Sequence, residues 1–135
     1  MPVSSDYLAY VVEQLAQTGK VSTRRMFGGI GVYCEGVFFG LIDDDVFYLK
    51  VDAANRQDYL ERHCQAFKPM ARDPNAYSMN YFAVPQEVLE DADELRSWAR
   101  KSIAIAAAAK LRALNPIPKR GKRAKKVAAK KRRKI

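Results

Sequence analysis

The last twenty residues, 116–135, limit how much of this chain can fold, because they hold eleven of its 24 Lys and Arg and none of its 15 Asp and Glu. Residues 1–115 carry thirteen basic and fifteen acidic side chains, a formal charge near −2 against +11 for the tail. The tail has too few apolar side chains to offset the entropy lost on ordering. The sequence therefore predicts one folded domain, residues 1–115, and a disordered Lys/Arg-rich tail, residues 116–135.

The spacing of apolar residues near the start predicts an amphipathic helix. Leu8, Val11, Val12 and Leu15 recur at the intervals i, i+3, i+4 and i+7, which place side chains on one helical face. We therefore expect a helix over residues 7–17 that ends before Gly19.

Three apolar runs with high β propensity follow, joined by short links. Met26 to Tyr33, Val37 to Ile42 and Val46 to Val51 are separated by Cys34-Glu35-Gly36 and by Asp43-Asp44-Asp45. Links of this length are typical of hairpins. The runs therefore predict three antiparallel strands in succession.

The next stretch predicts a second helix and two more strands. The helix is expected to be capped by Asp52 and to continue through His63 and Cys64. Extended segments at residues 67–69 and 77–84 follow it, with a Pro-containing loop between them.

A long last helix is predicted from an acidic capping sequence at residues 91–94 to about Leu114, with Trp98 on its apolar stripe. Asn115-Pro116 ends it, because proline cannot continue the hydrogen-bond ladder. The expected fold class is α+β: a two-layer, mostly antiparallel five-stranded sheet with helices, in the order α-β-β-β-α-β-β-α, followed by the disordered basic tail.

Several classes of protein are disfavoured. The chain has no apolar run of 18 residues and no basic leader before its first apolar positions, so we expect neither membrane insertion nor secretion, and a cytoplasmic location. Cys34 and Cys64 lack the spacing of a disulfide framework, and free thiols are expected in a reducing compartment.

Four strings carry a family resemblance. They are RMFGGIGVY at residues 25–33, GVFFGLI at 36–42, FYLKVD at 47–52, and SMNYF at 78–82, the last followed by Val84-Pro85 and Trp98-Ala99. In this order they resemble the TfoX N-terminal domain family, also called Sxy-like. The resemblance covers roughly residues 7–109.

The resemblance implies a regulatory role. Members of the family are associated with regulation of natural competence for DNA uptake, acting with a cyclic-AMP receptor protein at certain promoters. Their fold resembles the α/β arrangement of secretion-chaperone-like proteins. Longer members carry a second, helical C-terminal domain, whereas this chain has only its basic tail there. The family supplies no catalytic residue to transfer.

The tail is the strongest functional signal that does not depend on the resemblance. Its cations are interleaved with Ala, Gly and Pro, without aromatic rings for base stacking, which favours non-specific contact with the phosphates of DNA or RNA. A solubilising extension and electrostatic attraction to a membrane surface remain alternatives. The predicted nucleic-acid-binding residues are Lys119, Arg120, Lys122, Arg123, Lys125, Lys126, Lys130, Lys131, Arg132, Arg133 and Lys134.

Arg24 and Arg25 are candidate contacts for an anion or a protein partner, since two guanidiniums directly precede a strand. The string GGIG lacks the spacing of a phosphate-binding loop, so its glycines are interpreted as a bend or bulge that relieves packing. The family motif, interpreted as structural, comprises Met26, Phe27, Gly28, Gly29 and Gly31.

No catalytic or metal-ligating group is predicted, and no cofactor. Asp43, Asp44 and Asp45 lack the ligand spacing of an EF-hand and are interpreted as a hairpin turn. His63 is the only histidine and makes no zinc spacing with the cysteines.

Aromatic residues in the last extended segment leave one question open. Alternation places Tyr77, Met79 and Tyr81 on one face and Ser78, Asn80 and Phe82 on the other. The pattern does not decide which face is covered by a helix and which is exposed to a partner.

We therefore expect a non-enzymatic regulatory or accessory protein. Its folded domain would meet a protein partner in transcription regulation, or a second copy of itself as a homodimer, while the tail holds DNA or RNA non-specifically through phosphates. The alternative is a protein-interaction or chaperone-like module whose tail binds acidic protein surfaces.

Overall fold

The computed structural model describes residues 3–26, 28–67 and 78–114, with the side chains of Ser78 and Met79 left out. Within these ranges it is an α+β fold, as predicted. The helices are α1 (Ser5–Gln14), α2 (Arg56–Leu60), α3 (Gln86–Leu89) and α4 (Ala92–Leu114). The strands are β1 (Val21–Met26), β2 (Gly29–Cys34), β3 (Val37–Asp43), β4 (Val46–Lys50), β5 (Ala66–Phe67) and β6 (Ser78–Ala83).

The strands of the described ranges form one antiparallel sheet in the order β1-β2-β3-β4-β6-β5. The prediction of five strands is therefore wrong by one. The expected single strand over residues 26–33 is divided at Gly28, whose φ of +82° lets the chain reverse so that β1 pairs with β2. Half-buried and exposed side chains alternate over residues 21–24, but Arg24 and Arg25 are both exposed, and the polar composition of this segment did not predict a strand.

The second helix is shorter than predicted, and its start is different. The Asp52 side chain accepts from the Ala54 amide at 2.8 Å, which makes a turn before the helix rather than a cap on it. Asn55 takes the N-cap position, and α2 ends at Leu60. His63 lies beyond the helix at a φ of +57°.

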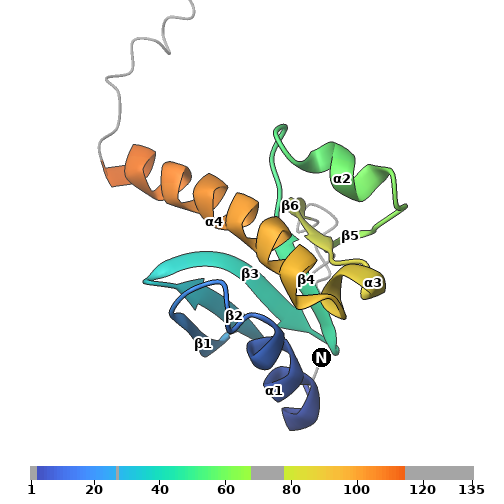
Figure 1. Ribbon diagram of the computed structural model, residues 1–135. Helices are drawn as coiled ribbons and strands as arrows, with labels where there is room; N and C mark the ends of the chain where they lie inside the picture. Colours follow the sequence, from blue (N-terminus) through green and yellow to red (C-terminus); the bar gives the residue numbers. More distant parts are fainter. Residues whose placement is uncertain (1–2, 27, 68–77, 115–135) are drawn as a thin grey trace, which may run out of the picture.

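Burial alternates most clearly along β4 and there separates the two faces of the sheet. In β4, Phe47 and Leu49 are buried while Val46, Tyr48 and Lys50 are half-buried. The buried set packs against the helices: Val11 of α1 and Leu15, the C-cap residue of α1, belong to the same core cluster. Figure 1 shows α4 lying across the sheet on this side.

Trp98 anchors α4 to the core, as predicted. It is 8% exposed, and its ring lies edge-on to Tyr59 with centroids 4.7 Å apart. Tyr59 in turn packs on Phe82 at 5.8 Å, so the Phe82 face of β6 is the one that the helices cover. This answers, for the described residues, the question left open by the sequence.

Helix α4 begins where the capping sequence predicted and outlasts the sheet beneath it. The Asp91 carboxylate accepts from the amides of Asp93 and Glu94 at 3.1 and 3.2 Å. The last buried residue of α4 is Ala106, and Leu111 and Leu114, which follow it in the helix, are 61% and 67% exposed. None of the described helices is long and apolar enough to cross a membrane.

Candidate nucleic-acid interface

The eleven tail cations lie outside the described residues, so the structure fixes only where the tail starts. Residue 115 directly follows the C-terminal end of α4 at Leu114. One turn earlier, the Lys110 ammonium donates to the Gly36 carbonyl at 3.3 Å, in the turn between β2 and β3. The last turns of α4 therefore lie at the β2–β3 end of the sheet.

The two candidate arginines of β1 are both exposed, but their side chains point to opposite faces of the sheet. Arg24 pairs with Gly31, and its guanidinium lies over the Tyr33 ring at 5.9 Å from the centroid. Arg25 is the next residue on the strand and pairs with Ile30, a core residue, so it belongs to the other face at the sheet edge. Of the two arginines, the structure thus places Arg24 against Tyr33 of β2.

The glycines of the family motif allow close approach within the protein. A Cβ on Gly29 would lie 2.6 Å from the Ile42 carbonyl oxygen, so a larger residue would push β2 from β3. A Cβ on Gly31 would meet Met26 at 2.9 Å and Phe38 at 3.1 Å. Phe27 lies outside the described residues. At Gly29 and Gly31 the neighbouring atoms of the protein thus occupy the space that a side chain would need.

The face of the sheet away from the helices carries a row of aromatic rings from three strands. We call Tyr33, Phe38 and Tyr81 the aromatic row: their successive ring centroids are 5.2 and 5.8 Å apart. All three are half-buried. Sequence reasoning placed Tyr81 on a candidate partner face but missed Tyr33 and Phe38.

Two cations border the aromatic row. Arg24 lies over Tyr33, and the Lys50 ammonium lies 5.2 Å from the centroid of Tyr81 at the other end. Lys50 and Tyr81 are paired residues of β4 and β6, which fixes their side chains on the same face. Burial, with a smaller effect of Tyr33, raises the pKa of Tyr81 to about 12.

The acidic turn Asp44-Asp45 links β3 to β4, at the end of β3 away from Gly36. Asp44 and Asp45 adopt positive φ angles of 52° and 56° in the turn, as a two-residue hairpin requires. The Asp45 carboxylate also accepts from the Ser4 amide at 2.8 Å, which holds the start of α1 against the turn. In the described part of the chain, no three His, Cys, Asp or Glu side chains converge on a metal position.

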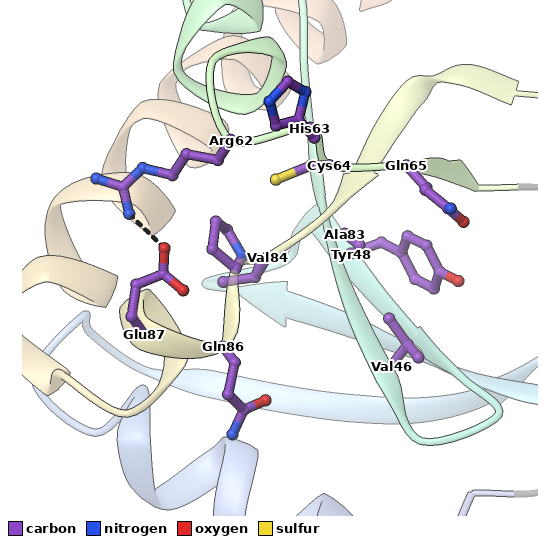
Figure 2. A pocket seen from close by; sticks show the side chains of 11 residues that line it. Val46, Tyr48, Arg62, His63, Cys64, Gln65, Ala83, Val84, Gln86 and Glu87 are labelled. Atoms are coloured by element: carbon purple, nitrogen blue, oxygen red, sulfur yellow. Dashed lines mark hydrogen bonds and ion pairs between the residues drawn. The ribbon is translucent and has the colours of Figure 1, made fainter.

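A shallow cleft of about 430 Å³ opens where β4 starts and β6 ends, next to the start of α3 (Figure 2). Its ion pair joins Arg62 to Glu87 at 3.1 Å, and the Cys64 sulfur points into it while His63 points away. Burial raises the pKa of the Cys64 thiol; Glu87 adds to the rise and Arg62 opposes it. This direction is the opposite of the lowered pKa that nucleophilic cysteines have.

A comparison with known protein families found a match that covers most of the described residues. The model of the TfoX N-terminal domain matches residues 13–106, more than half of the chain. The matched range includes every residue of the aromatic row and of the cleft, and it stops before the tail. No curated protein matches the sequence.

Proposed function

Because this chain belongs to the TfoX N-terminal domain family, we propose that it is a non-enzymatic regulatory or accessory protein, of the kind associated with natural competence, that acts on nucleic acid. The folded domain meets a protein partner in transcription regulation or a second copy of itself, and the tail of residues 116–135 binds DNA or RNA non-specifically through phosphates. The alternative is a protein-interaction module whose tail binds acidic protein surfaces.

The observation that supports the proposal is the separation of charge along the chain. Eleven cations without any carboxylate follow directly on the exposed end of α4, whereas residues 1–115 are close to neutral. Such a segment releases counterions from a polyanion, and this favours binding without base recognition. Phosphates of either DNA or RNA satisfy this chemistry.

The test replaces all eleven tail Lys and Arg by Gln in the full-length chain. A matched control replaces only Arg120, Arg123, Arg132 and Arg133 by Lys, which changes the side chains and keeps the charge. We expect the Gln variant to lose most of its affinity for a duplex at low salt and the Lys variant to keep it. Wild type should show a slope of log K against log salt of about −5 to −9 if roughly six to ten cations meet phosphates.

Truncation after Asn115 provides a second arm. The core cluster spans residues from Val11 to Ala106, so the shortened chain should still unfold cooperatively while its duplex affinity is lost. Unchanged duplex affinity in both tail variants would refute the proposal. A protein partner recovered equally by wild type and tail variants, in a complex that survives nuclease, would favour the protein-interaction module instead.

A further inference from the structure

The aromatic row has the composition and the position of a base-stacking platform. Tyr33, Phe38 and Tyr81 come from β2, β3 and β6, and they lie on the sheet face away from α4. The interplanar angles between successive rings are 39° and 40°, so the rings form a tilted series rather than a closed stack. Every nucleobase has a π face that can stack on such a ring, whatever its sequence.

The cations that border the row supply the complementary charge. Arg24 lies over the Tyr33 ring and Lys50 over the Tyr81 ring, so a bound base would displace these mobile cations from the ring faces and leave them next to its phosphates. Within the described strands the acidic residue is Asp43, which is five positions along β3 from Phe38, about 16 Å in an extended strand; Glu35 lies outside the strands, in the β2–β3 turn. An anionic ligand with exposed aromatic faces is thus favoured over an acidic protein surface.

We propose that the aromatic row, with Arg24 and Lys50, binds the bases of single-stranded nucleic acid, an inference that rests on the proposed nucleic-acid function of the tail. In a duplex the bases stack on one another and offer the rings no free face, so the row selects single strands. The tail supplies affinity for any phosphate backbone, and the row supplies the preference for unpaired bases.

The start of the tail brings the two parts together. Gly36, whose carbonyl accepts from Lys110 of α4, is two residues from Phe38 and three from Tyr33. Residues 115–135 follow Leu114 and, from bond geometry, can span at most about 70 Å. A strand held by the tail is therefore at high effective concentration near the row, and the two contacts reinforce each other.

The experiment uses full-length variants and three probes of about 20 nucleotides: oligothymidylate, oligouridylate and a DNA duplex. One variant combines Tyr33→Leu, Phe38→Leu and Tyr81→Leu, which removes the rings but keeps apolar side chains. The matched control combines Tyr33→Phe and Tyr81→Phe, which keeps the rings and removes only hydroxyls. The ammonium end of the row is tested separately by Lys50→Gln.

The Leu variant should lose about tenfold or more in affinity for the single strands, with duplex affinity within about twofold of wild type. The Phe control should bind both as wild type does. Lys50→Gln should weaken single-strand binding and lower its salt slope by about one unit. Equal losses for oligothymidylate and oligouridylate would mean that the row accepts DNA and RNA alike; a loss for one alone assigns the row to that nucleic acid.

The two proposals fail separately. If the Leu variant binds single strands as wild type does while the tail-neutralised chain binds nothing, the stacking proposal is overturned and the tail function stands. If the tail-neutralised chain keeps its duplex affinity, the tail function fails whatever the row does. A dimer that the Leu variant converts to a monomer without loss of single-strand affinity would assign the row to a second copy and overturn the proposal. Should the triple variant not unfold cooperatively, the single Tyr33→Leu and Phe38→Leu variants decide by the same measurements.

Discussion

Asn55 connects the end of β4 to the start of α2, and its removal should destabilise the whole domain. The side chain is 2% exposed. Its oxygen accepts from the Asp52 amide at 2.9 Å, and its amide nitrogen donates to the Lys50 carbonyl at 3.2 Å. The Ser102 hydroxyl of α4 donates to the same carbonyl at 2.7 Å. A change to alanine therefore removes two hydrogen bonds with different consequences.

The expected loss follows from what each partner keeps. The Asp52 amide would lose its side-chain acceptor in a partly buried position, which costs about 1–3 kcal/mol. The Lys50 carbonyl would keep its bond from Ser102, so the second loss costs only about 0.5–1.5 kcal/mol. We expect Asn55→Ala to lower the free energy of unfolding by about 2–4 kcal/mol and the melting temperature by roughly 10 °C.

The single tryptophan makes the measurement direct. Trp98 is buried against Tyr59, so its fluorescence reports global unfolding in urea, and the midpoint and slope give the change in free energy. Asn55→Asp is the matched control, since it keeps an acceptor for the Asp52 amide. Burial and the nearby Asp52 carboxylate should raise the pKa of the new carboxyl in the folded state, so its deficit against wild type should shrink as pH falls below that raised value.

A loss below about 0.5 kcal/mol for Asn55→Ala, with an unchanged urea slope, would refute this reasoning, because it would mean that neither hydrogen bond restrains the β4–α2 connection. An Asn55→Asp deficit that grows on acidification would refute the assigned sign of the pKa shift.

Two further predictions concern the sheet. Gly40→Ala should lower the free energy of unfolding in urea by about 1–3 kcal/mol, because the added Cβ would lie 2.8 Å from the Tyr48 carbonyl oxygen. Gly36→Asn should lower it by less than about 1 kcal/mol, because asparagine tolerates the φ of +83° and only the Lys110 ammonium lies within 4 Å of the added Cβ; the reverse order would contradict the packing argument. The pKa of Tyr81 is raised to about 12, so its contribution to stability is complete below pH 10 and is lost as pH rises from 10 to about 12. Ultraviolet titration of wild type and of Tyr81→Phe should differ by one phenol that ionises near pH 12, and a difference centred near pH 10 would exclude the shift.

Local signals predicted the helices well where their pattern was long. The apolar stripe that contains Trp98 and the Asp91 cap placed α4 almost to the residue, because capping and a 3.6-residue period are properties of one segment. The turn at Gly28 was missed because it lies within an apolar string that reads as continuous strand, and a positive φ is not visible in sequence. The one-turn helix α3 was missed for lack of length.

The aromatic row could not be predicted from alternation within single strands. Tyr33 and Phe38 meet only because β2 and β3 shift register near Val32, and Tyr81 joins them because β6, far along the chain, inserts beside β4. Strand order and register depend on the whole packed sheet. The tail, by contrast, was evident from composition, and its predicted role remains a prediction.

The overhang of α4 gives the tail a mechanical connection to the domain. From Ala107 to Leu114 the helix is exposed except for the half-buried Ala109, and the Lys110 contact with Gly36 holds this overhang from the side. About 12 Å of helix, held by this one side-chain contact, thus separates the last buried residue, Ala106, from the tail that we propose binds a polyanion. Tension transmitted along a bound polyanion would unfold residues 107–114 before the core and the sheet, because these residues bury the least side-chain surface of the helix.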